Sequence, residues 1–149
     1  MSRRFNDCLE KGLLRKIPAS KDNAERSIKR AEIWLKEAKK TLDSNAYDSS
    51  VLSSYLVMFH SARAILFHDG YREKSHACVA RYLEEKYAKG NLIEKKWIDL
   101  LDHQRSIRHD NQYDLSFFAS DKEAINAVEA AALFLTRMRK LLTHIKKSE

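Results

Sequence analysis

Two long segments of this chain repeat apolar residues with the period of an α-helix, and this repeat limits the fold more than any other feature. Apolar residues three or four positions apart lie on one side of a helix, where they can be buried together. Such stripes run through residues 22–42 and 120–145. The first contains Ala24, Ile28, Ala31, Leu35, Ala38 and Leu42, and the second contains Ile125, Val128, Ala132, Leu135, Met138, Leu142 and Ile145. The chain is therefore expected to fold as packed helices.

A third long helix is expected from about Tyr47 to Asp69, and it is apolar on almost all sides. Such a helix either lies at the centre of a bundle or shares its surface with a second subunit, and the second possibility predicts a dimer. Gly70 follows it, at the position where many helices end in a left-handed residue. Two polar residues, His60 and Arg63, lie on one side of this helix. His60 is either a hydrogen-bonded core residue or a group with a chemical role.

Residues that form tight turns are scarce, since the 149 residues include only 3 Gly and 1 Pro. This scarcity favours an all-α fold, and no strand is predicted. A chain of this length is expected to form one domain, residues 1–149, as an up-and-down bundle of about five helices. Residues 1–18 would form a short leading helix and residues 20–145 the bundle. The shorter helices are expected over residues 4–16, from Ser75 to about Lys89 and from Ile93 to about Arg108, and the last helix opens with a capping box at Ser120 and Glu123.

The most polar stretch of the chain is Arg105-Ser-Ile-Arg108-His109-Asp110-Asn111-Gln112-Tyr113-Asp114, which lies between two of these helices. It brings two arginines, a histidine, two amides and a tyrosine into ten residues. Two interpretations are open: it is a solvated connection between helices, or it is a site of chemistry.

The net charge is informative about possible partners, and the cysteines are informative about the cellular compartment. The net charge of +7 is compatible with RNA or DNA as a partner, and equally with a requirement for solubility alone. Cys8 and Cys78 are far apart and have no neighbouring cysteine or histidine at ligand spacing. Neither a zinc site nor a disulfide framework is expected from them, and a reducing cytoplasm fits better. No apolar run is long enough for a membrane span or a signal peptide.

Several motifs resemble those of the HEPN domain, most closely those of small, free-standing archaeal and bacterial members. The first is Tyr55-Leu-Val-Met-Phe-His-Ser-Ala-Arg-Ala, an aromatic helix that ends at a glycine and is followed by Ser75-His76. The second is Arg108, four residues, then Tyr113-Asp114. A long helix containing alanines follows from Ser120. The resemblance covers residues 20 to 145 and the short leading helix.

This resemblance implies a five-helix fold, a homodimer and a toxin-like role. Many HEPN proteins are metal-independent endoribonucleases with an Arg-x(4–6)-His motif, and some work with a minimal nucleotidyltransferase that silences them, in certain systems by nucleotidylating a tyrosine near the motif. Here Tyr113 stands where the histidine after Arg108 would be. A tyrosine with an ordinary pKa of about 10 is a poor general base at neutral pH. His109 directly follows Arg108, so on a helix the two side chains would point about 100° apart.

Two functions remain open. The first is a HEPN toxin-like protein that binds or cleaves RNA and is paired with a nucleotidyltransferase. The second is a non-catalytic helical module that binds a nucleotide or docks a nucleotidyltransferase. Neither requires a cofactor or a metal, and no membrane is expected to be involved. The candidate catalytic residues are Arg108, Tyr113 and His109, and the candidate phosphate-binding residues are Arg105, Asp110, Asn111, His60 and Arg63.

Overall fold

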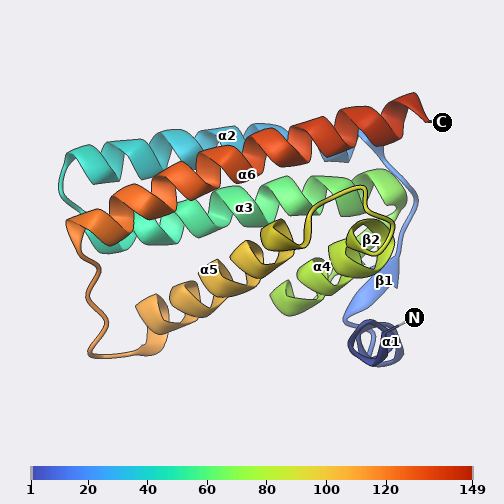
Figure 1. Ribbon diagram of the computed structural model, residues 1–149, viewed down its shortest axis with the longest axis horizontal. Helices are drawn as coiled ribbons and strands as arrows, with labels where there is room; N and C mark the ends of the chain where they lie inside the picture. The colour runs from blue at the N-terminus through green and yellow to red at the C-terminus, as the bar shows by residue number, and fades with distance from the viewer. Residues whose placement is uncertain (1, 149) are drawn as a thin grey trace.

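The computed structural model of the protein describes residues 2–148. Its elements follow one another as α1 (Arg3–Glu10), β1 (Leu14–Lys16), α2 (Lys21–Asp43), α3 (Tyr47–Asp69), β2 (Tyr71–Glu73), α4 (His76–Leu83), the π-helical segment η1 (Glu84–Ala88), α5 (Lys95–Tyr113) and α6 (Asp121–Lys147). The three longest helices, α2, α3 and α6, run side by side, while α4 and α5 lie along a second side and α1 closes one end (Figure 1). The predicted all-α bundle is confirmed.

The three long helices begin and end close to the predicted positions because their sequences carry the signals that begin and end helices. The Ser20 side chain accepts a hydrogen bond from the backbone N–H of Asn23 at the start of α2. At the start of α6, Ser120 and Glu123 form the predicted capping box. Such caps satisfy backbone donors that have no partner within the helix. Ile125, which was predicted to face the core, is 43% exposed, and Ala124 is buried in its place.

Helix α3 is the centre of the bundle. It packs against α2, α4, α5 and α6, which accounts for its apolar surface without a second subunit. By length and composition alone α3 could span a membrane, but 78% of its most apolar window is buried inside the bundle. The helix ends at Gly70, whose φ of +89° is the left-handed conformation predicted there. A Cβ atom at Gly70 would also lie 2.8 Å from the carbonyl oxygen of Ile17.

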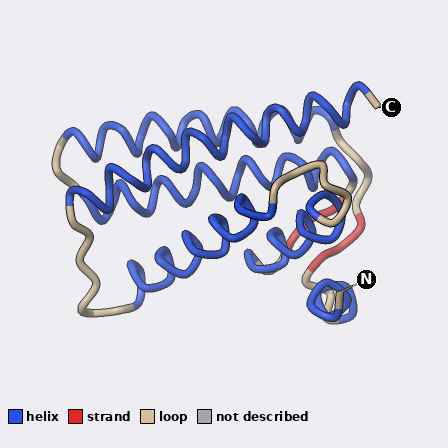
Figure 2. The backbone as a smooth tube through the Cα atoms, in the orientation of Figure 1, coloured by secondary structure: helices blue, strands red, loops and turns tan. Residues whose placement is uncertain are grey.

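The N-terminal region differs from the prediction of one helix over residues 4–16. Helix α1 ends at Glu10, and Gly12 then adopts a φ of +68°. Strand β1 follows and pairs with β2 in an antiparallel ladder, with Leu14 opposite Glu73 (Figure 2). The prediction that no strand would form was therefore wrong. These strands are three residues long, and their pairing rests on backbone hydrogen bonds, which the side-chain pattern does not reveal.

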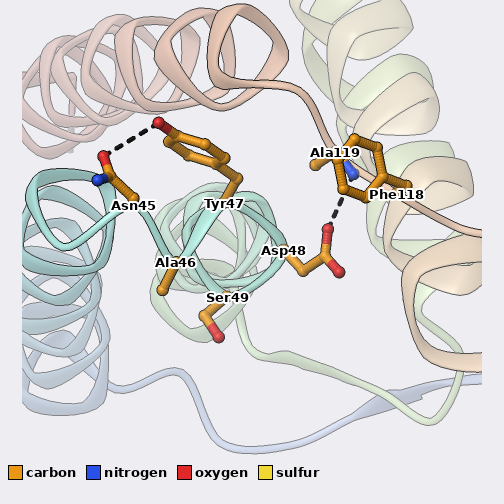
Figure 3. A pocket seen from close by; sticks show the side chains of 7 residues that line it. All are labelled: Asn45, Ala46, Tyr47, Asp48, Ser49, Phe118 and Ala119. Atoms are coloured by element: carbon orange, nitrogen blue, oxygen red, sulfur yellow. Dashed lines mark hydrogen bonds between the residues drawn. The ribbon is translucent and has the colours of Figure 1, made fainter.

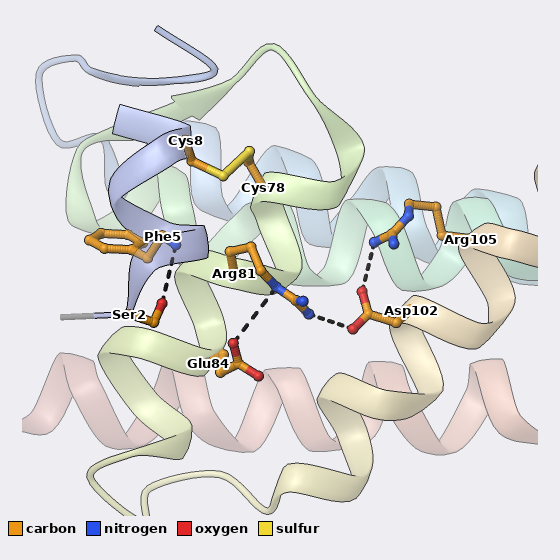
Figure 4. The surroundings of a disulfide bond; sticks show 8 residues. All are labelled: Ser2, Phe5, Cys8, Cys78, Arg81, Glu84, Asp102 and Arg105. Atoms are coloured by element: carbon orange, nitrogen blue, oxygen red, sulfur yellow. Dashed lines mark hydrogen bonds and ion pairs between the residues drawn. A yellow bond between two sulfur atoms is a disulfide. The ribbon is translucent and has the colours of Figure 1, made fainter. Parts of the chain in front are cut away.

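Cys8 and Cys78 form a disulfide, contrary to the expectation of free thiols (Figure 4). They are 70 residues apart in sequence. They meet because α1 packs against α4, where the Phe5 ring lies 6.4 Å from that of Tyr82. The inference of a reducing compartment from the cysteine spacing therefore has no support.

The polar stretch is helical from Arg105 to Tyr113 rather than a connection, and only its last residue, Asp114, lies outside the helix. Helix α5 was expected to end near Arg108, yet it continues to Tyr113. A helix exposed to solvent tolerates polar residues because water satisfies their side chains, so polarity alone does not end it. The connection to α6 is held at Asp48, whose carboxylate accepts a hydrogen bond of 2.9 Å from the backbone N–H of Ala119. Figure 3 shows this contact beside a surface pocket that Tyr47 and Phe118 also line.

Candidate functional site

One face of α3 provides the floor of the candidate site. Tyr55, Phe59 and Arg63 are spaced four residues apart, so they lie in a row along the helix. The Tyr55 and Phe59 side chains are almost completely buried. The site is therefore built on the central helix of the core, where packing restricts movement.

His76, the first residue of α4, lies against this row. Its ring stacks on Phe59 with 4.0 Å between the ring centroids and 11° between the planes. The Tyr55 hydroxyl lies 2.8 Å from Nδ1 of His76. Stacking and hydrogen bonding together fix both the position and the orientation of the imidazole.

Burial and nearby arginines keep His76 neutral. Burial, together with the positive charges of Arg108, Arg63 and Arg105, lowers the pKa of His76 to about 4. Burial raises the pKa of Tyr55 to about 12, so its hydroxyl keeps its proton. Because a buried hydroxyl needs an acceptor for that proton, we assign Tyr55 as the donor to Nδ1. The Nε2 atom of His76 then carries the ring hydrogen and is a donor.

Two arginines of α5 stand beside this histidine. The Arg108 guanidinium lies 5.3 Å from the centre of the Tyr55 ring, and its Nη1 donates a 3.0 Å hydrogen bond to the side-chain oxygen of Gln112. Among residues 2–148, Arg108 forms no ion pair with a carboxylate. It therefore keeps a positive charge available to an anion.

Arg105 is held by a carboxylate that two arginines share. Its Nη1 lies 2.7 Å from Asp102, and the other oxygen of Asp102 pairs with the buried Arg81 (Figure 4). Arg81 also lies 3.8 Å from Glu84. Asp102 thus orients Arg105 while its negative charge is divided between two guanidinium groups.

His60 and Arg63 continue the site along α3. Arg63 lies 2.7 Å from Glu73 of β2, and its guanidinium also lies 4.9 Å from the centre of the Phe67 ring. Burial lowers the pKa of His60 to about 4, assisted by the charges of Arg63, Arg30 and His76. Both histidines of the site are therefore neutral at pH 7.

The sequence-predicted site residues separate onto different sides of α5. The positive charges of Arg105 and Arg108 act on His76, and that of Arg63 acts on both His76 and His60. His109 and Tyr113 lie on another side, with 4.9 Å between their rings, and Tyr113 is 67% exposed. At about 100° per residue, His109 lies about 100° and Tyr113 about 140° around the helix from Arg108, whereas His109 lies only about 40° from Arg105.

The two remaining candidates, Asp110 and Asn111, lie apart from the histidine cluster. Asp110 is exposed, with its carboxylate 3.9 Å from His109. Asn111 donates a 2.9 Å hydrogen bond to the backbone oxygen of Asp48, which ties α5 to the start of α3. Asn111 therefore has a structural contact that is separate from the phosphate contact predicted for it.

Sequence analysis did not assign a role to His76 or Tyr55. Both residues were visible at the two ends of the matched aromatic segment, so a signal existed. The contact between them could not be read from the sequence because they are 21 residues apart and on different helices. Within residues 2–148, no three histidine, cysteine, aspartate or glutamate side chains are grouped so that they could hold a metal ion.

A comparison with known protein families shows which proteins this chain resembles. The profile of the HEPN domain matches residues 24–141. The chain belongs to the HEPN family. Two proteins of Methanocaldococcus jannaschii, each named a putative toxin, resemble this HEPN protein. One is 24% identical over 82% of this chain and 83% of its own length, and the other is 26% identical over 79% and 87%. A UPF0332 protein of Pyrococcus horikoshii is 29% identical over 57% of this chain and 60% of its own. The resemblance inferred from the motifs is confirmed.

Proposed function

We propose that this HEPN protein is a toxin-like protein that acts on RNA at the site formed by Arg108, Arg105 and His76. The observation that carries the proposal is a neutral histidine, fixed by Tyr55 and Phe59, beside two arginines of which one has no carboxylate partner. Arginines bind phosphate through planar, paired hydrogen bonds, and a positive site attracts the RNA backbone. Toxin-named relatives from the same family support the role.

The proposed reaction is metal-independent cleavage of a phosphodiester. The RNA 2′-oxygen attacks the adjacent phosphorus while the bond to the 5′-oxygen breaks, which leaves a 2′,3′-cyclic phosphate and a free 5′-hydroxyl. Arg108 and Arg105 would stabilise the extra negative charge of the transition state. An RNA phosphate offsets the arginine charges and so raises the pKa of His76. Protonated His76 can then give its proton to the leaving 5′-oxygen, and water takes the proton of the 2′-hydroxyl.

An RNA cleavage assay in EDTA tests this proposal. We expect Arg108→Ala and His76→Ala to lose cleavage. His109→Ala is the matched control, because His109 is adjacent to Arg108 but lies on a different side of α5. Cleavage that persists in a folded Arg108→Ala or His76→Ala protein would contradict the assigned roles.

The alternative is a non-catalytic module that binds a nucleotide or docks a nucleotidyltransferase. The position of Tyr113 and His109 favours it, because neither side chain joins the Arg108 cluster. RNA or nucleotide binding that depends on Arg108, without any cleavage by the wild-type protein, would support this alternative and exclude the first proposal.

We further propose a minimal nucleotidyltransferase as the partner, with Tyr113 as the residue that it modifies. The Tyr113 side chain is 67% exposed near the end of α5, where a partner can reach it. Its hydroxyl would attack the α-phosphate of a nucleoside triphosphate and release pyrophosphate. Intact-mass measurement after incubation with the partner should show one added nucleoside monophosphate in the wild type and none in Tyr113→Phe. Addition to Tyr113→Phe would exclude this site.

A homodimer remains a proposal that rests on the family. The apolar surface of α3, which suggested a dimer, is covered within one chain. Sedimentation at micromolar concentration tests the proposal, and a compact monomer would contradict it.

A further inference from the structure

A second basic pocket lies between α2, α3 and β2. It has a volume of about 430 Å³, and four arginines line it: Arg26 and Arg30 of α2, Arg63 of α3 and Arg72 of β2. His60 and Phe67 of α3 form part of its wall. Of the arginines, only Arg63 entered the candidate site predicted from the sequence. The other three are brought to it by the α2–α3 packing and by β2.

The charges of this pocket are largely uncompensated. Arg63 is paired with Glu73 at 2.7 Å. Arg26, Arg30 and Arg72 form no ion pair with any carboxylate in residues 2–148. Four guanidinium groups against one carboxylate leave three positive charges. Arginines placed this close repel one another, and an anion bound among them would remove that cost.

The uncharged parts of the pocket also suit an anionic ligand. Ser27 donates its hydroxyl hydrogen to the backbone oxygen of His60 at 2.7 Å, which ties α2 to α3 at the pocket wall. The Arg30 guanidinium lies 5.3 Å from the centre of the Trp34 ring, so its position is supported by stacking. The pocket walls are therefore rigid helices, and less ordering is needed on binding.

We propose that this pocket binds a terminal phosphate group, carried by the 5′ end of an RNA or by a free nucleotide. Three unpaired guanidiniums offer more charge than a single phosphodiester would neutralise, whereas a phosphomonoester carries close to two negative charges at pH 7. Guanidinium forks also match the geometry of phosphate oxygens. The pocket shares His60 and Arg63 with the candidate site, but Arg108 and Arg105 do not line it, so the inference stands whether or not the protein cleaves RNA.

A triple variant, Arg26→Gln/Arg30→Gln/Arg72→Gln, tests the pocket and leaves the Arg63–Glu73 ion pair intact. The control variant Lys36→Gln/Lys39→Gln/Lys40→Gln removes the same three charges from exposed positions of α2. These lysines begin six residues beyond Arg30, about 9 Å further along the helix axis, and none of them lines the pocket. All proteins also carry Arg108→Ala, so that cleavage does not consume the probe and the proposed function is tested separately. Circular dichroism melting confirms that each variant folds.

The probes are a 10-nucleotide RNA with a 3′ fluorophore and either a 5′-phosphate or a 5′-hydroxyl, and ATP compared with adenosine. We expect the parent and the control variant to bind at least one phosphorylated ligand roughly tenfold tighter than its unphosphorylated counterpart. The triple variant should bind both members of the pair equally. A preference in the RNA pair identifies an RNA end as the source, and a preference in the ATP pair alone identifies a free nucleotide. No preference in the parent, or an equal loss in the control and triple variants, would overturn the proposal.

Discussion

Reduction of the Cys8–Cys78 disulfide should lower the free energy of unfolding by about 4 kcal/mol. The bond closes a loop of about 70 residues, from α1 to the first turn of α4. A cross-link restricts the unfolded chain, and the entropy of closing a loop of this size corresponds to roughly 4 kcal/mol at 25 °C. This is a large share of the roughly 5–15 kcal/mol that stabilises a typical domain.

The effect is measurable by thermal unfolding with and without a thiol reductant. For a chain of this length, about 4 kcal/mol corresponds to a drop in melting temperature of roughly 8–16 °C. Mass spectrometry after alkylation should confirm two free thiols in the reduced sample. The double variant Cys8→Ala/Cys78→Ala provides the control, because it should match the reduced wild type and be insensitive to reductant.

The outcome that would refute this reasoning is a wild-type melting temperature that stays the same, to within about 2 °C, after complete reduction. Such a result would mean that the unfolded chain is already restricted without the bond, or that the disulfide does not form in solution. Alkylation of the untreated protein separates these two explanations, since an absent disulfide would leave both thiols reactive.

Three further predictions concern His76 in the site, the glycine that ends α3 and the Asp102 carboxylate. The pKa of His76, measured by NMR, should be about 4 and should rise when phosphate is added. Between pH 4 and 6.5 the unfolded chain binds more protons at this residue than the folded chain does, so the free energy of unfolding should fall as the pH drops through that window. A measured pKa near 6.5 would contradict the argument from burial. Gly70→Ala should lower the free energy of unfolding in urea by roughly 1–3 kcal/mol, because residue 70 has a left-handed backbone conformation and an added Cβ would clash with the carbonyl oxygen of Ile17. An unchanged urea midpoint would refute this. Asp102→Asn should lower the free energy of unfolding by about 2 kcal/mol in the same assay, because buried Arg81 loses a charged partner. A stability equal to that of the wild type would show that Glu84 alone compensates the charge of Arg81.

Much of the fold followed from local sequence signals, and the exceptions share a cause. The stripes of α2 and α6, the cap at Ser120 and the glycine after α3 are encoded within a few residues, so the helix bounds could be predicted closely. The β1–β2 pairing and the disulfide join segments about 60 to 70 residues apart. Neither has a local pattern, because each depends on how the helices pack.

The same distinction explains the candidate site. Arg105 and Arg108 could be selected because they stand together in a polar stretch, and His60 and Arg63 because they interrupt an apolar helix. Tyr55 resembled an ordinary core residue, and its hydrogen bond to His76 exists only once α4 lies against α3. The separation of Tyr113 from Arg108 required knowing that α5 remains helical through that stretch.

Because α3 lies at the centre of the bundle, the same helix contributes to the hydrophobic core and to the candidate site. Tyr55 and Phe59 belong both to the hydrophobic core and to the floor of the site. Any change that shifts α3 along its axis moves these side chains together relative to His76 and the arginines of α5. Tight packing transmits such shifts rather than absorbing them. Substitutions at core positions of α3 such as Met58 should therefore change binding without contacting the ligand. Substitutions of the arginines on α2, β2 and α5 should change binding without disturbing the core.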